Sequence, residues 1–151
     1  AQALMEAAGD DGDFDALCQQ LHRYQPTLRT CFTLENFDNL IKNGRMRPIV
    51  GTLLRSLGIH IIADATAEGT IHVADKARGV GKTYRAITAL MKASKDCTDA
   101  EVVISHCENL EGAMALKRQI LADLPVKQVD LLSCRGLTSF YAMEKGLIVG
   151  Y

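Results

Sequence analysis

The residues with the clearest potential for chemistry are Gly81, Lys82 and Thr83, which match the last three positions of a phosphate-binding loop. The full signature is G-x-x-x-x-G-K-[ST], in which the first glycine lets the backbone curl around the phosphates. That glycine is due at position 76, where the sequence has Lys76. The motif is therefore incomplete, and an enzyme that binds phosphate or nucleotide at Gly79–Thr83 is kept as an alternative function.

Lys76, Arg78 and Lys82 form a basic turn between a strand-like stretch and a helix-like stretch. The first turn of a helix attracts anions through its unpaired N–H groups and its dipole. Cations at an exposed helix start are also common without any ligand. A protein-interaction module that binds no ligand and uses these cations is the second alternative.

The cysteines and histidines show no metal-ligand spacing. The five cysteines contain no C-x-x-C pair, and the four histidines contain no H-x-x-x-H pair. His60 and His72 lie on the two strands of a predicted hairpin, and whether they meet depends on its register. An odd number of scattered cysteines is typical of reduced thiols in a cytoplasmic protein. We therefore expect no bound metal.

Two polar stretches, Ser105-His106 and Ser133-Cys134-Arg135, lie where a predicted strand gives way to a helix. In open α/β sheets, ligands bind at the carboxyl ends of strands, so these positions are well placed for a site. No G-x-S-x-G motif or acid–base partner accompanies them. Taken alone, Cys134 is interpreted as a buried thiol rather than a nucleophile.

Size and composition predict a single soluble domain. The chain has 151 residues, 48% of them hydrophobic and 23% charged. Its net charge of -1 argues against a general nucleic-acid-binding protein. Arg55 and His60 interrupt the longest apolar stretch, which excludes stable membrane insertion there. The opening residues AQALMEAAG read like a helix already under way, as expected of a piece of a longer protein.

Hydrophobic periodicity predicts an α/β fold with helices packed on a mixed sheet. A hairpin is followed by alternating strands and helices. After the GKT motif, one helix face carries Val80, Tyr84, Ile87 and Met91. The other helices are predicted at 13–24, 35–44, 49–57, 109–124 and 136–143, and the strands at 29–34, 59–63, 70–77, 101–105, 128–133 and 147–151.

In this order, the segments resemble the C-terminal domain of the DegV family. The resemblance is carried by a strand that ends in Thr33-Leu34, a Gly44-Arg45 turn after the next helix, the leucine-rich helix 49–57, a glycine-bearing hairpin and the basic turn Lys76-x-Arg78-Gly79. It extends over the whole chain.

The resemblance implies that residues 1–151 form one domain, the C-terminal half of a bacterial protein that binds a long-chain fatty acid. The family's N-terminal domain, which supplies hydroxyl groups to the lipid carboxylate, would lie outside this chain. Such a protein is a cytoplasmic, non-catalytic carrier with no cofactor, and it presents the fatty acid to a fatty acid kinase subunit. Lys76, Arg78 and Lys82 match the family surface implicated in docking that kinase.

The same resemblance indicates which residues contact the lipid. Many family members carry a Gly-x-His-x-Gly-Pro-Gly loop near the C-terminus, and Cys134 takes the place of its histidine. Arg135 or Thr138 is the expected substitute for the lost imidazole. The expected lining of the apolar tunnel comes from helix 49–57 and strand 59–63, through Leu53, Leu57, Ile59 and Ile61, although each of these also suits an ordinary core.

Overall fold

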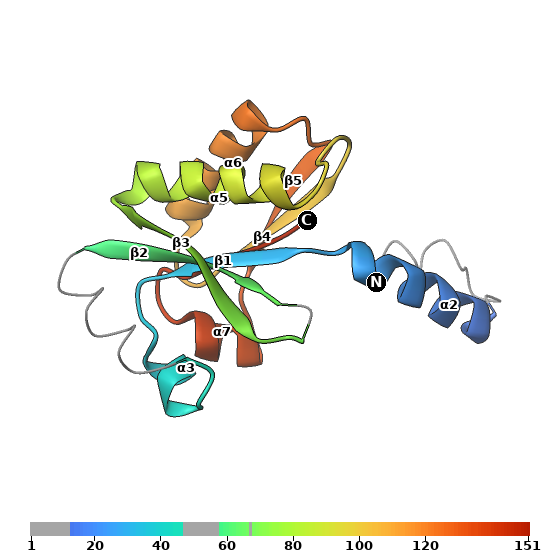
Figure 1. Cartoon of the computed structure of the whole chain (residues 1–151), viewed down its shortest axis with the longest axis horizontal. Helices are drawn as coiled ribbons and strands as arrows, with labels where there is room; N and C mark the ends of the chain where they lie inside the picture. Colours follow the sequence, from blue (N-terminus) through green and yellow to red (C-terminus); the bar gives the residue numbers. More distant parts are fainter. Residues whose placement is uncertain (1–12, 47–57, 67) are drawn as a thin grey trace.

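The computed structural model describes residues 13–46, 58–66 and 68–151, which form a six-stranded sheet with helices on both faces (Figure 1). The strand order is β3-β2-β1-β6-β4-β5. The strands are β1 (Thr30–Leu34), β2 (Ile59–Ala65), β3 (Ile71–Arg78), β4 (Glu101–His106), β5 (Gln128–Ser133) and β6 (Leu147–Gly150). The helices are α2 (Phe14–Tyr24), the short 3-10 helix η1 (Gln25–Thr27), α3 (Asp38–Lys42), α5 (Val80–Ser94), α6 (Leu110–Asp123) and α7 (Gly136–Ala142).

The sheet is mixed, which confirms the predicted fold class. Only β4 and β5 pair in parallel, because α6 crosses between them, and the remaining neighbours are antiparallel. These directions place the ends of β1, β3, β4 and β5 beside the beginnings of β2 and β6. We call this side of the sheet the loop end. The Ser105-His106 and Ser133-Cys134 stretches both lie there.

Helices α5 and α6 cover one face of the sheet, above the strands in Figure 1. The predicted apolar face of α5 is confirmed for Tyr84, Ile87 and Met91, which are buried against the sheet. Val80 differs, with 52% of its surface exposed, because it is the first residue of the helix and lies at the loop end. On α6, Ala113, Leu116 and Ile120 are buried. Leu110, Met114 and Leu121 of the same helix are exposed.

Helices α3 and α7 cover the opposite face, where a second apolar cluster forms. Asn39 of α3 donates a hydrogen bond from Nδ2 to the Phe140 carbonyl oxygen of α7, at 2.7 Å. The guanidinium of Arg45 lies over the Tyr141 ring, 5.1 Å from its centroid. The buried members of the second cluster are Leu34, Phe37, Leu40, Met46, Ile61, Ala63 and Ala142.

The hairpin of β2 and β3 contains a register shift between Ile62 and Ala63. As a result His60 lies opposite Ala77, and His72 lies opposite Asp64. His72 Nδ1 is 2.9 Å from Asp64 Oδ1, so the two histidines do not meet. The predicted strand 59–63 is confirmed and continues to Ala65.

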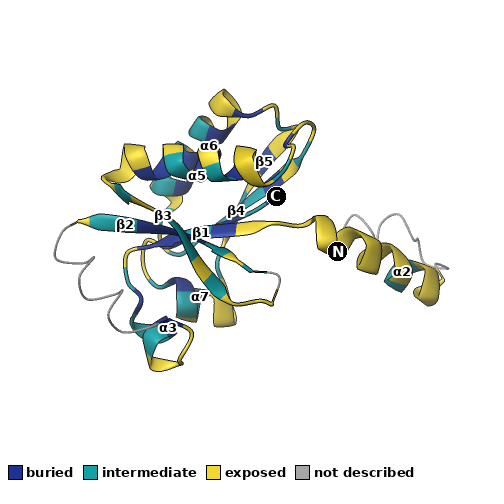
Figure 2. Cartoon of the chain, in the orientation of Figure 1, coloured by how far each residue is buried: buried dark blue, intermediate teal, exposed yellow. Residues whose placement is uncertain are grey.

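Helix α2 extends away from the sheet and buries none of its residues (Figures 1 and 2). Its first turn is capped by Asp13, whose side chain accepts a hydrogen bond from the Asp15 backbone N–H. Phe14 and Leu21 are exposed although they lie at helical spacing. Among the described residues, no helix combines the length and apolar character needed to cross a bilayer.

Candidate functional site

The residues predicted to contact the lipid head group come together in one hollow at the loop end. It has a volume of about 410 Å³ and lies where β5 leads into α7. Gly136 begins α7 with a φ of 50°, a conformation that glycine adopts without strain. We call this hollow the Cys134 pocket. Its lining residues are Ser105, Leu131, Leu132, Ser133, Cys134, Arg135 and Thr138.

Cys134 is half-buried and packs against the second apolar cluster. Its backbone N–H donates to the His106 carbonyl oxygen at 2.8 Å, which continues the pairing of β4 and β5. Burial raises the pKa of the Cys134 thiol, and the neighbouring Cys107 raises it further. The thiol is therefore neutral near pH 7 and donates only weak hydrogen bonds.

Arg135 and Thr138 are exposed at the mouth of the same pocket. The Thr138 backbone N–H donates to the Arg135 carbonyl oxygen at 3.1 Å, which fixes their relative position in the first turn of α7. No carboxylate of the described residues forms an ion pair with the Arg135 guanidinium. Its charge is available to an anion in the pocket.

Ile59 and Ile61 belong to the same apolar cluster as Cys134, on the face covered by α3 and α7. Ile61 is completely buried, whereas Ile59 is half-buried where β2 begins at the loop end. The other two predicted lining residues, Leu53 and Leu57, lie outside the described residues, as does the predicted helix 49–57.

Lys76 and Arg78 face the same side of the sheet as this cluster. Lys76 lies directly opposite Ile61, and Arg78 lies opposite Ile59; paired residues of neighbouring strands point to the same face. Both cations are exposed on β3, five strand spacings from β5, or roughly 24 Å. Lys82 is also exposed, but on α5, which covers the opposite face. The structure thus separates Lys82 from the other two cations.

The GKT motif does not form a phosphate-binding loop. Thr83 is 1% exposed, and its hydroxyl donates to the Gly79 carbonyl oxygen within the same helix, at 3.1 Å. In a working loop this hydroxyl would contact magnesium. Gly79, at a φ of 84°, serves the turn between β3 and α5. The motif is thus explained as a strand-to-helix turn.

No group of three or more metal-ligating side chains gathers anywhere in the described parts of the chain. All five cysteines are free thiols.

Comparison with known families supports the resemblance drawn from the sequence. The family model described as "Uncharacterised protein, DegV family" matches residues 1–147. The chain belongs to the DegV family. A DegV domain-containing protein from Streptococcus gordonii is 31% identical over 151 residues, which cover 99% of this chain and 53% of that protein. The chain therefore spans about half the length of the curated relatives it matches.

Solved structures of DegV proteins share this fold. A DegV family protein from Eubacterium eligens, loaded with heptadecanoic acid, superposes with a TM-score of 0.88 at 25% identity, over 99% of this chain and 54% of that one. The fatty acid kinase (Fak) B3 protein of Streptococcus pneumoniae, loaded with linoleic acid, superposes with a TM-score of 0.86 at 30% identity, over 99% of this chain and 53% of that one.

Sequence reasoning about this DegV chain missed Cys107 as a neighbour of Cys134. The signal was present in the strand–helix–strand order of residues 101–133, since such a unit pairs its strands in parallel. Parallel pairing of His106 with Ser133 places the next residues, Cys107 and Cys134, side by side at the loop end.

Proposed function

We propose that this chain is the C-terminal half of a DegV protein that carries a long-chain fatty acid in the cytoplasm and presents it to a fatty acid kinase subunit. The chain itself is not catalytic. The Cys134 pocket receives the carboxylate, with Arg135 and Thr138 as its polar contacts. The acyl chain follows the apolar face on which Ile59 and Ile61 lie.

The observation that carries this proposal is the common location of the polar pocket and the apolar cluster. Cys134 belongs to both, since it lines the pocket and packs against the cluster. A fatty acid needs this combination, with a cation near its head group and apolar surface along its tail. Each buried CH₂ contributes about 0.8 kcal/mol, so the length of the apolar surface would select the chain length.

We further propose that an N-terminal domain completes the lipid site, as the greater length of the relatives suggests. Exposed apolar side chains support this arrangement. Leu132, Leu137 and Phe140 are exposed around the Cys134 pocket and α7. Phe14 and Leu21 are exposed on α2, at the N-terminal side of the described chain. Exposed large apolar side chains of this kind often mark a contact with another domain or a ligand.

Fatty acid is expected to copurify with the protein when the N-terminal domain is present. Organic extraction followed by mass spectrometry should find close to one long-chain fatty acid per molecule of the longer protein, and much less on the 151-residue chain. After its lipid has been removed, the longer protein should be stabilised by about 2.7 kcal/mol in thermal unfolding when oleic acid is added at 100 times its Kd.

Two leucines of similar exposure make a matched test of where the lipid lies. Leu132 is 54% exposed and lines the Cys134 pocket, whereas Leu121 is 48% exposed on α6, across the sheet. Leu132→Glu should abolish fatty acid binding, and Leu121→Glu should leave it unchanged. Equal effects of the two substitutions, or absence of lipid from the longer protein, would contradict the proposal.

Reversal of one charge on β3 is expected to slow docking of the kinase. Arg78→Glu should reduce the association rate with a purified fatty acid kinase subunit roughly tenfold at low salt, because exposed charges act mainly by steering the encounter. Surface plasmon resonance at two salt concentrations would measure this. Lys92→Glu, in the last turn of α5, is the control for net charge. If both variants slow association equally, the docking site does not lie at Arg78.

A further inference from the structure

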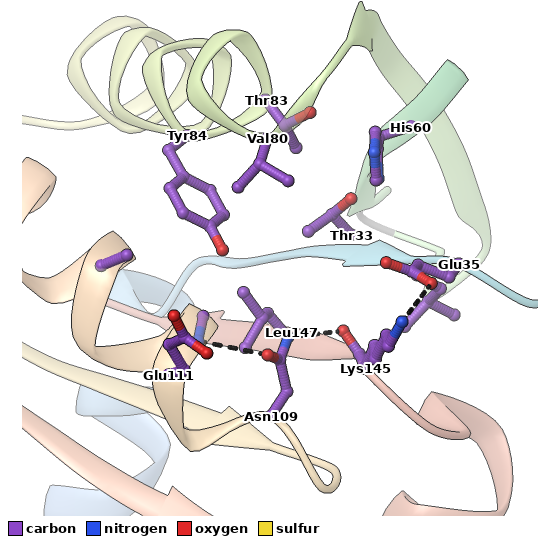
Figure 3. A pocket seen from close by; sticks show the side chains of 13 residues that line it. Thr33, Glu35, His60, Val80, Thr83, Tyr84, Asn109, Glu111, Lys145 and Leu147 are labelled. Carbon is purple, nitrogen blue, oxygen red and sulfur yellow. Dashed lines mark hydrogen bonds and ion pairs between the residues drawn. The ribbon is translucent and has the colours of Figure 1, made fainter. Parts of the chain in front are cut away.

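A second cavity lies at the loop end on the opposite face of the sheet from the Cys134 pocket (Figure 3). It is bordered by the end of β1, the beginnings of β2 and β6 and the first turns of α5 and α6, and its volume is about 260 Å³. This volume is below the range typical of drug-sized ligands and suits a small molecule. We call it the Thr33 cavity.

The cavity contains a buried hydroxyl group without a partner. Thr33 is 5% exposed, and its Oγ1 forms no hydrogen bond with any of the described residues. Buried polar atoms in native proteins are nearly always hydrogen-bonded, to protein, water or a ligand. The other two buried threonines, Thr83 and Thr88, both donate to named acceptors. Thr33 is therefore the exception, and it lines the cavity.

Tyr84 brings a second hydroxyl to the same space. The residue is 8% exposed, and Figure 3 shows its ring extending from α5 toward the sheet with the hydroxyl at the cavity. Burial raises the pKa of Tyr84, and the carboxylates of Glu35 and Glu111 raise it further. Both carboxylates therefore act on the space around this hydroxyl.

The charged groups of the cavity are divided between its two sides. Glu111 lies on the α6 side, whereas Lys145 and Glu35 lie on the other side, 3.7 Å apart between Nζ and Oε2 (Figure 3). The lining residues thus include two carboxylates, of Glu35 and Glu111, and the ammonium group of Lys145. His60 also lines the cavity, beside Thr33 and Glu35. Asn109 lies at the bottom of the cavity in Figure 3 and links its two sides. Its side chain donates to the Lys145 carbonyl oxygen at 2.9 Å and accepts from the Gly112 N–H at 3.2 Å.

We infer that the Thr33 cavity binds a small zwitterionic amino acid. Its ammonium group donates to the Tyr84 hydroxyl and to the Glu111 carboxylate, both of which border the cavity. Its carboxylate lies on the opposite side of the cavity, where it meets Lys145 and accepts a hydrogen bond from the Thr33 hydroxyl. Val80, Ala115 and Leu147 form an apolar wall for a short side chain. This inference does not depend on fatty acid binding, which uses the other face.

A simple anion or a simple cation fits the cavity less well. A carboxylate alone leaves Glu111 next to a second negative charge, which opposes binding. An ammonium alone adds a second cation to the cavity and leaves Lys145 with Glu35 as its ion-pair partner, so nothing occupies the Lys145 side. Only a ligand that carries both charges pairs with both sides of the cavity.

The test is a titration of the ¹⁵N-labelled 151-residue chain with four probes: L-alanine, L-serine, L-threonine and L-valine. Propionate and ethylamine, which each carry one of the two charged groups, serve as matched halves. We expect at least one amino acid to shift the amide signals of Thr33, Tyr84 and Gly112 saturably below about 10 mM. Both halves should bind at least tenfold more weakly. If none of the four saturates, or if either half binds as tightly, the inference is overturned.

Three variants locate the binding. Thr33→Val and Glu111→Gln preserve shape and should each weaken binding of the amino acid at least tenfold. Thr138→Val, in the Cys134 pocket, should leave it unchanged. A dispersed spectrum of each variant shows that the fold is retained. Equal losses in all three variants, or no loss in the first two, would place the binding elsewhere and overturn the inference.

Discussion

Replacing Ile61 with alanine is expected to lower the free energy of unfolding by about 2–5 kcal/mol. Ile61 is completely buried on β2, between Leu34 of β1 and Lys76 of β3. The neighbouring strands fix its surroundings, so the space left by the lost atoms cannot collapse. Urea unfolding followed by circular dichroism measures this change.

Ile59 is the matched control because it lies two residues away on the same strand and the same face. It is only half-buried, at the loop end. Ile59→Ala should therefore lower stability by clearly less than Ile61→Ala. If the acyl chain passes over Ile59, the same variant should weaken fatty acid binding. Equal stability losses would show that both residues are core and that neither one is principally a lining residue.

This pair illustrates what the sequence could and could not predict. The stretch that contains Ile59 and Ile61 is rich in β-branched apolar residues, which predicts that both isoleucines face the interior. Both pack in the second cluster. The sequence could not distinguish core from lining, because that depends on distance from the loop end. Strand direction and register set that distance, and both come from pairing with β1 and β3.

The register of the hairpin shows the same limit for polar residues. Its two strands were predictable from alternation and a central glycine. One extra residue on β3, at the shift between Ile62 and Ala63, decides which side chains share a face. With this register, Lys76 and Arg78 face the second cluster, whereas His60 faces the Thr33 cavity. A sequence pattern does not reveal such a bulge.

The basic turn was predicted as one unit, and the structure divides it between two layers. Residues 76–82 are contiguous in the sequence, but Gly79 turns the chain from β3 into α5. Lys82 therefore belongs to the helix layer, on the side of the sheet opposite the second cluster. The docking proposal rests on Lys76 and Arg78, and Lys82 is the cation least expected to affect it.

Replacing Thr33 with valine is expected to raise the free energy of unfolding by about 1 kcal/mol in the absence of ligand. A buried hydroxyl without a partner costs desolvation energy, and valine has nearly the same shape without that cost. Valine is also well suited to a central strand. Thermal and urea unfolding of both proteins measure the difference.

Thr88→Val is the control, with the opposite expected sign. Thr88 is also buried, but its hydroxyl donates to Asp123 Oδ2 at 2.7 Å. Its removal should lower stability, because the hydrogen bond is lost and the carboxylate loses a donor. If the free energy of unfolding rises for Thr33→Val and falls for Thr88→Val, the Thr33 hydroxyl is unsatisfied in the unliganded protein.

The sign of the Thr33→Val effect also bears on the reason for the hydroxyl. A hydroxyl group that lowers the stability of the unliganded protein is most simply explained if it forms a hydrogen bond with a bound ligand. Adding the amino acid that saturates the cavity should therefore stabilise the native protein and leave Thr33→Val nearly unaffected, which narrows or reverses the difference between them. A loss of stability in unliganded Thr33→Val would mean that the hydroxyl already has a partner, and the Thr33 cavity would then lack the unsatisfied group that indicates a ligand.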